Sequence, residues 1–145
     1  MPILREIKIR YAFKEVDCEI TGQALNKPQR IYEVFNFLKF EPKEKFIVVN
    51  LSNQNTIMNY EVVATGTVNS IQLRPAEVLR TAIIINAPAI VLVHNHPSGI
   101  VNPSKADITF TKVIIDAAKL LSIDVLDHII IGESDFYSLK KHGDM

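Results

Sequence analysis

Residues 89–108 read AIVLVHNHPSGIVNPSKADI, and this stretch decides how the rest of the chain is interpreted. Its first five residues are continuously apolar, which is typical of a central strand buried on both faces of a sheet. A loop with two prolines and one glycine follows, and Ser104 then marks the expected start of a helix. The stretch therefore predicts a strand, a loop and a helix, with polar residues where the buried strand ends.

Helices and strands are expected on both sides of this stretch. The expected strands cover residues 3–13, 46–51, 58–67, 89–93, 125–131 and 136–139. The expected helices cover residues 28–41, 75–86 and 104–121. Residues 17–28 are expected to form a loop, Gly66 predicts a bulge or a close backbone approach, and the third helix is expected to bury Val113 and Leu121. This mixed order predicts an α/β (α+β) fold, a three-layer α-β-α sandwich with a mixed sheet.

The composition is that of one globular domain. The chain has 145 residues, of which 48% are hydrophobic and 22% are charged. Sixteen Lys and Arg balance sixteen Asp and Glu, so the positive excess that drives non-specific nucleic-acid binding is absent. A single cysteine, Cys18, excludes an intramolecular disulfide and a multi-cysteine zinc ribbon. Because no signal peptide and no apolar stretch of membrane-spanning length is found, a soluble cytoplasmic protein is expected.

His94, His96 and Asp107 are the residues that predict chemistry. Residues two apart on an extended backbone point to the same side, so His94 and His96 can direct their imidazoles at one point. Asp107 lies one turn into the expected helix, where the intervening loop can return it to the histidines. Two histidines and a carboxylate form a catalytic zinc set that leaves a fourth position open. Two structural alternatives remain: satisfied strand-end histidines, and a helix capping box formed by Ser104 and Asp107.

The joint pattern resembles the JAMM motif of the JAB/MPN metalloprotease superfamily: His-x-His-Pro, a gap of six residues, then Ser-x-x-Asp. Within that superfamily the chain is most similar to the RadC family. The stretches that carry the resemblance are GTVNS (66–70), RPAEV (74–78), VHNHPSG (93–99), NPSKADI (102–108) and LDHIIIG (126–132). The resemblance implies a JAB/MPN-like, cytidine-deaminase-like fold for residues 31–145, with residues 1–30 as a strand and loop of the same domain.

The resemblance also implies roles for the residues of the motif. His94, His96 and Asp107 would be the ligands of one Zn²⁺ per chain, and Ser104 would hydrogen-bond the developing oxyanion. The zinc would lower the pKa of a water molecule to about 7, and a carboxylate outside the ligand set would act as general base.

The general base is harder to assign from the sequence. By resemblance it opens a strand that follows the first helix, and Glu44 in PKEKF (42–46) occupies that place. Glu61, in the next strand, is the second candidate, and Glu77 is expected to be structural. From the residues alone, the favoured interpretation of Glu44 is a solvated charge between Lys43 and Lys45.

The resemblance implies a zinc-dependent hydrolase that acts on a peptide or isopeptide bond, in a family named for DNA repair. The alternatives are a metal-holding binding module in DNA-repair or mobile-element complexes without proteolysis, and a nuclease, which the zero net charge disfavours. Full-length relatives carry a helix-hairpin-helix region that does not occur in residues 1–30, so tight DNA binding is not expected. Strand 3–13 is expected to allow edge pairing with another chain.

Asp127 and His128 belong to the LDH part of the resemblance and fall on the expected strand 125–131. Either they support the metal ligands from behind, or they are satisfied polar residues at a sheet edge.

Overall fold

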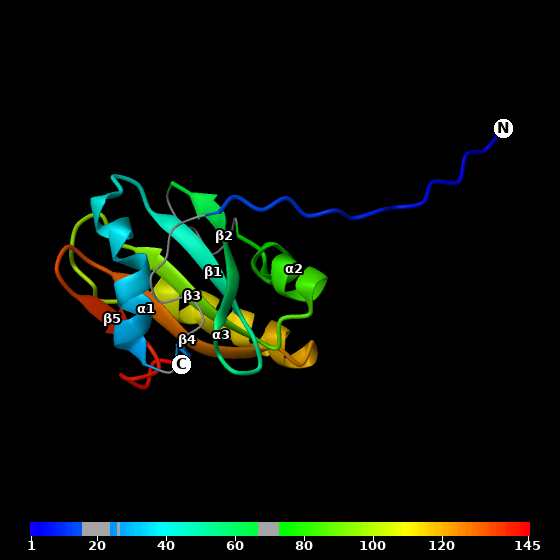
Figure 1. Cartoon of the computed structure of the whole chain (residues 1–145). Helices are drawn as coiled ribbons and strands as arrows, with labels where there is room; N and C mark the ends of the chain where they lie inside the picture. Colours follow the sequence, from blue (N-terminus) through cyan, green and yellow to red (C-terminus); the bar gives the residue numbers. More distant parts are fainter. Residues whose placement is uncertain (16–23, 26, 67–72) are drawn as a thin grey trace.

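Five strands form one mixed sheet in the computed structural model, which describes residues 1–15, 24–25, 27–66 and 73–145 (Figure 1). The strands are β1 (Lys45–Leu51), β2 (Ile57–Thr65), β3 (Ala89–Asn95), β4 (Asp124–Ile131) and β5 (Phe136–Ser138), in the spatial order β2-β1-β3-β4-β5. β3 and β4 are parallel, and the other neighbouring pairs are antiparallel. The prediction of a central strand is confirmed, because β3 is the middle strand and every one of its residues is buried.

Helices cover both faces of this sheet. They are α1 (Pro28–Phe35), continued by the 3-10 helix η1 (Asn36–Phe40), and α2 (Pro75–Ile85) and α3 (Lys105–Leu120). One core cluster lies between the sheet and α2 with α3, and a second lies between the sheet and α1 with η1. The predicted three-layer α-β-α sandwich with a mixed sheet is therefore confirmed (Figure 1).

The residues of β1 show how the alternation of a strand serves both cores. Phe46 and Val48 lie in the cluster under α2 and α3, whereas Ile47 and Val49 lie in the cluster under α1. Successive side chains point to opposite faces, so a strand without polar interruptions is buried only when both faces are covered. The run of β-branched residues is thus consistent with a position inside the sheet.

The expected strand at residues 3–13 does not form. Residues 1–15 have no regular secondary structure and extend away from the sheet (Figure 1). The alternating apolar residues of this segment are exposed, and Tyr11 Oη donates a hydrogen bond to the carbonyl oxygen of Ile84. A strand requires a hydrogen-bonded neighbour, and no described residue supplies one to this segment.

Two residues expected on the buried side of the third helix differ from expectation, Val113 within α3 and Leu121 at its C-cap. Val113 and Leu121 were expected to be buried, but they are 46% and 49% exposed. The buried residues of this helix are Phe110, Thr111, Ile114 and Ala118. This three-to-four-residue spacing defines a narrow buried stripe along the helix. Val113 comes one residue before Ile114, so its side chain points away from the stripe and towards solvent.

Several predictions lie partly or wholly outside the described residues. They concern Cys18, most of the expected loop at 17–28 and the last residue, Thr67, of the expected strand 58–67. In the part of the chain that is described, no helix combines the length and the apolar character needed to cross a bilayer.

Candidate metal centre

The end of β3 places the two histidines of the His-x-His pattern. His94 is almost completely buried, and its ring is stacked against Phe46 of β1 at a centroid distance of 6.0 Å. His96 lies just beyond the strand and is half-buried, with its Nε2 3.0 Å from Nε2 of His94. Both imidazoles therefore direct Nε2 to the same point, as the spacing of two residues on an extended backbone predicts.

The first turn of α3 supplies the carboxylate. Ser104 is the N-cap: its Oγ accepts from the backbone N–H of Asp107 at 3.0 Å, and its own N–H donates to Oδ2 of Asp107 at 2.9 Å. The same carboxylate reaches the histidines, with Oδ1 3.5 Å from Nε2 of His94 and Oδ2 3.3 Å from Nε2 of His96. The capping interpretation and the ligand interpretation are thus both compatible with this geometry.

Close backbone contacts hold the loop between the histidines and the helix. Nδ1 of His96 is 2.7 Å from the carbonyl oxygen of Ile100, and the backbone N–H of His96 donates to the carbonyl of Ile131 at 2.9 Å. The loop passes so close to Gly132 that a Cβ there would lie 2.7 Å from the carbonyl oxygen of Gly99. A side chain at Gly132 would therefore displace the loop.

The charges of the group reinforce one another. Burial opposes ionisation of Asp107, but the close contacts of its carboxyl with His94 and His96 outweigh it and hold the pKa of the Asp107 carboxyl well below its usual range. The hydrogen bond to Asp107 raises the pKa of His96, against the opposing effect of burial, and the negative charge of Glu44 contributes in the same direction. The Asp107 carboxylate is therefore held in its ionised form beside the two histidines, where it would stabilise a cation.

These three residues could hold a metal ion. Each offers one ligand atom, and the three atoms lie within 4.8 Å of one another. Three protein ligands leave one position of a tetrahedral ion open for water or substrate. The residues thus fit a metal of the catalytic type.

Glu44 lies next to this group. It immediately precedes β1 and is half-buried. The ladder of β1 with β3 ends at the pair Phe46–His94, and the Asn95 side chain then accepts from the N–H of Lys45 at 2.7 Å and donates to the carbonyl oxygen of Lys43 at 3.1 Å. These bonds hold the segment that contains Glu44 beside the end of β3. The carbonyl oxygen of Glu44 accepts from the N–H of Gly66 at 2.8 Å, and Gly66 has a φ of 115°, a conformation that favours glycine.

The other two glutamates have structural partners. Glu61 of β2 is opposite Val48, and its Oε1 accepts from Nε of Arg80 on α2 at 3.1 Å. Glu77 accepts a hydrogen bond from the backbone N–H of Arg74 at 2.8 Å and completes the capping box of α2. The structure does not place either one in the group formed by His94, His96 and Asp107.

A layer of buried polar residues lies behind the ligands. Nε2 of His128 is 2.7 Å from Nδ1 of His94, and Nδ1 of His128 is 2.6 Å from Oγ1 of Thr111. Both His128 and Thr111 are fully buried. The sequence analysis does not identify Thr111 as a site residue. Its position one helical turn after Asp107, on the same face of α3, is the feature that could have indicated it.

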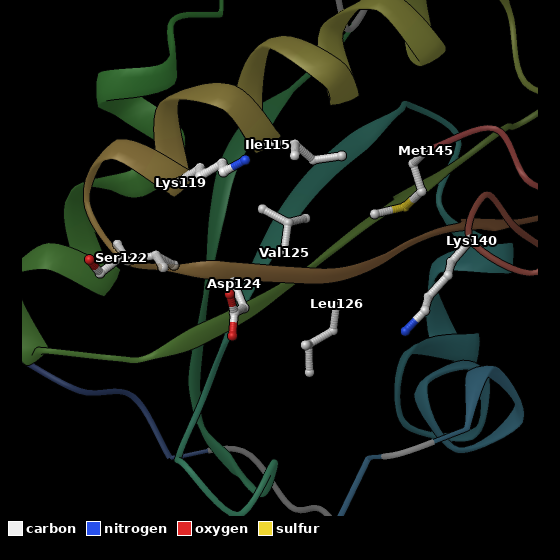
Figure 2. Close-up of a pocket in the computed structure, with 9 residues that line it drawn as sticks. Ile115, Lys119, Ser122, Asp124, Val125, Leu126, Lys140 and Met145 are labelled. Atoms are coloured by element: carbon white, nitrogen blue, oxygen red, sulfur yellow. The ribbon is translucent and has the colours of Figure 1, made fainter.

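A hollow in the described part of the molecule lies away from this group. It has a volume of about 470 Å³ and lies between the end of α3, the start of β4 and the last residues of the chain (Figure 2). Its lining residues are Ile115, Lys119, Ser122, Ile123, Asp124, Val125, Leu126, Lys140 and Met145. None of the candidate metal ligands contributes to it.

Comparisons with known proteins agree with this arrangement. A family model described as a RadC-like JAB domain matches residues 25–144. A UPF0758 protein of Methanosarcina mazei is 39% identical over 130 residues, which cover 89% of this chain and 57% of that protein. A UPF0758 protein of Methanosarcina barkeri is 41% identical over 117 residues, which cover 80% of this chain and 51% of that protein.

The chain spans a little more than half the length of the curated relatives that it matches. The family model nevertheless covers most of the chain, including the histidines of the β3 end and the carboxylate of α3. By both comparisons, the chain belongs to the family of RadC-like JAB domains.

Proposed function

We propose that the chain is a zinc-dependent hydrolase of the JAMM type that cleaves a peptide or isopeptide bond. The observation that carries the proposal is the convergence of Nε2 of His94, Nε2 of His96 and the Asp107 carboxylate on one point. Packing alone does not require two imidazoles and a carboxylate to meet in this way, because buried charge is costly unless it is paired or coordinates a metal.

Zinc is the metal that this donor set favours. Imidazole nitrogens and a carboxylate oxygen are zinc ligands, and an incomplete tetrahedral set is typical of catalytic zinc sites. When bound, zinc would polarise a substrate carbonyl and acidify a water molecule. His94, His96 and Asp107 would hold the ion, and the burial of His94 would fix its position.

Glu44 is the general base in this proposal. Two observations support this role: Glu44 immediately precedes β1, beside the end of β3, and its negative charge acts on His96, although it is not one of the three grouped ligands. Glu44 would take a proton from the attacking water and deliver it to the leaving amine as the carbon–nitrogen bond breaks. Ser104 Oγ accepts from the Asp107 N–H through one of its two lone pairs, and its hydroxyl hydrogen would donate to the oxyanion.

Two glutamine substitutions test the proposal. The chain is assayed with zinc on fluorogenic peptides and on a lysine-linked isopeptide, and its zinc content is measured in parallel. Glu44→Gln should keep the zinc content and lower hydrolysis by about 10²–10⁴-fold, the usual worth of a general base. Glu61→Gln is the matched control, and it should change hydrolysis far less because Glu61 is paired with Arg80.

The possible results separate the proposed hydrolase from the other candidate function. Zinc binding without hydrolysis of any peptide or isopeptide would favour the metal-holding binding module. A larger loss in Glu61→Gln than in Glu44→Gln would show that the wrong glutamate has been assigned. We expect only weak, salt-sensitive binding of duplex DNA, because the chain has no net positive charge.

A further inference from the structure

We infer that Thr111 and His128 are positioning residues that fix the proton of His94 on Nδ1 and so keep its Nε2 free for a metal ion. The inference rests on the proposed zinc site, and it concerns residues that are not among the ligands. Two buried polar side chains and the hydrogen bonds between them carry it.

The donor and acceptor of each hydrogen bond can be assigned starting from Thr111 on α3. The hydroxyl of Thr111 donates to the backbone carbonyl oxygen of Asp107 at 2.6 Å, four residues earlier in the same helix. A hydroxyl has a single hydrogen, so this bond leaves only lone pairs on Oγ1. The contact of 2.6 Å to Nδ1 of His128 therefore requires that His128 carries a hydrogen on Nδ1.

The next bond transfers this requirement to His94. A neutral imidazole with its hydrogen on Nδ1 has an unprotonated Nε2, which can only accept. Nε2 of His128 lies 2.7 Å from Nδ1 of His94, so the hydrogen of this bond belongs to His94 Nδ1. Nε2 of His94 then carries a lone pair, and it is this atom that faces His96 and Asp107.

A backbone carbonyl fixes the position of the ring hydrogen of His96 in the same way. Nδ1 of His96 is 2.7 Å from the carbonyl oxygen of Ile100, which can only accept, so this nitrogen carries the hydrogen. Both Nε2 atoms are then left to share one point with the Asp107 carboxylate. Lone pairs 3.0 Å apart repel unless a cation lies between them, so the assembly favours a bound cation.

The reverse arrangement would oppose metal binding. If Thr111 donated to His128, the hydrogen of His128 would lie on Nε2 and would be donated to His94 Nδ1. The hydrogen of His94 would then lie on Nε2, the atom that must bind the metal. One helix thus supplies both the ligand Asp107 and, through Thr111, the restraint on a ligand of the neighbouring strand.

Paired substitutions at Thr111 test this inference. Thr111→Val keeps the shape of the side chain but removes the acceptor, so His128 is expected to move its hydrogen to Nε2. Thr111→Ser keeps the hydroxyl. Thr81→Val is the matched control, because the Thr81 hydroxyl also accepts a side-chain hydrogen bond, from Asn50, but does so on α2, away from the ligands.

Two measurements are made on the full chain. Affinity for Zn²⁺ and Co²⁺ is measured by competition with a chelator, and the imidazole hydrogens are located in the metal-free protein by long-range ¹H–¹⁵N NMR at a pH where the histidines are neutral. We expect Thr111→Val to weaken zinc binding by about 10–100-fold, the usual effect of losing a residue that supports a ligand. Thr111→Ser and Thr81→Val should stay within about threefold of the unmodified chain.

The NMR signature separates positioning from general damage. In the unmodified chain and in Thr111→Ser, His94 and His128 should both carry the hydrogen on Nδ1, and in Thr111→Val both should shift towards Nε2. Unchanged tautomers, or equal loss of affinity in Thr111→Val and Thr111→Ser, would overturn the inference. If the unmodified chain bound no metal, the proposed function would fail, whereas the tautomers of the metal-free protein would still decide the role of Thr111.

Discussion

Asp127 and His128 are consecutive residues of β4, yet their side chains serve different parts of the molecule. His128 lies on the sheet face covered by α3, where it contacts His94 and Thr111 behind the candidate metal centre. Asp127 lies on the opposite face, where it accepts hydrogen bonds from Ser138 Oγ at 2.6 Å and from its neighbour's backbone N–H at 2.7 Å.

The carboxylate of Asp127 also organises the C-terminal end of the chain. The backbone N–H of Lys140 donates to Oδ1 of Asp127 at 3.2 Å, and the hydroxyl of Ser138 accepts from the N–H of Lys141 at 3.0 Å. These bonds fasten β5 and the following turn to β4. Two consecutive residues of one short motif therefore have separate roles: His128 supports the candidate site, and Asp127 stabilises the fold.

The largest expected effect comes from removing a proposed metal ligand in the centre that His128 supports. His96→Ala should weaken zinc binding by more than the roughly 10–100-fold expected for a supporting residue, because a bond to the metal itself is lost. Chelator competition measures this loss. His142→Ala is the control, since this exposed histidine lies near the C-terminus and outside the centre; equal affinity in both variants would contradict the assignment.

On the other face, Asp127→Ala should lower stability rather than metal binding. It leaves the N–H groups of His128 and Lys140 and the hydroxyl of Ser138 without their acceptor, so the free energy of unfolding should fall by about 2–4 kcal/mol. Denaturant titration measures this change. As a control, Asp116→Ala at an exposed position should lower the free energy of unfolding by less than about 0.5 kcal/mol. A loss of zinc stoichiometry in folded Asp127→Ala would show that the roles of Asp127 and His128 are not separate.

A smaller change isolates one part of the Asp127 cluster. Ser138→Ala removes one hydrogen bond to the carboxylate and should lower the free energy of unfolding by about 1 kcal/mol. The Asp127→Ala/Ser138→Ala double variant should be less destabilised than the sum of the single variants, because both remove the same bond. Additive effects would mean that this bond contributes little.

The smallest expected effect is a dependence on pH. Burial raises the pKa of the Asp127 carboxyl, against the opposing hydrogen bond from Ser138, so the folded chain holds this proton more tightly than the unfolded chain does. The contribution of this group to stability is therefore present below its unfolded pKa of about 3.9 and is lost as the pH rises through the higher folded pKa.

Comparing the unmodified chain with Asp127→Asn isolates this contribution, because asparagine does not titrate. The difference in unfolding free energy between the two chains, measured at a series of pH values, should fall as the pH rises above about 4. A difference that grows over this range would show that the hydrogen bonds to the ionised carboxylate outweigh its burial.

Much of the fold follows from the sequence for local reasons. The continuous apolar run at residues 89–93 is stable only inside a covered sheet, and proline, asparagine and Ser104 mark the helix ends directly. The strand predicted for residues 3–13 was wrong because alternation indicates a strand only where a neighbour completes its hydrogen bonds. The prediction that Val113 is buried was wrong because the elements packed against a helix decide how wide its buried face is.

For the site, the local arrangements follow from the sequence. The spacing of His94 and His96 depends on the geometry of one strand, and that of Ser104 and Asp107 on one helical turn. These distances are set within a few residues, so they are predictable without the rest of the molecule.

The distant residues that meet the site depend on how the strands and helices pack together. The pairing of β1 with β3 brings Glu44 beside the end of β3, the packing of α2 pairs Arg80 with Glu61, and the parallel pairing of β3 with β4 places His128 behind His94. Each of these contacts joins segments whose separation along the chain says nothing about their distance in space. They depend on strand order and on which face each side chain occupies, and those are properties of the assembled sheet rather than of any single segment.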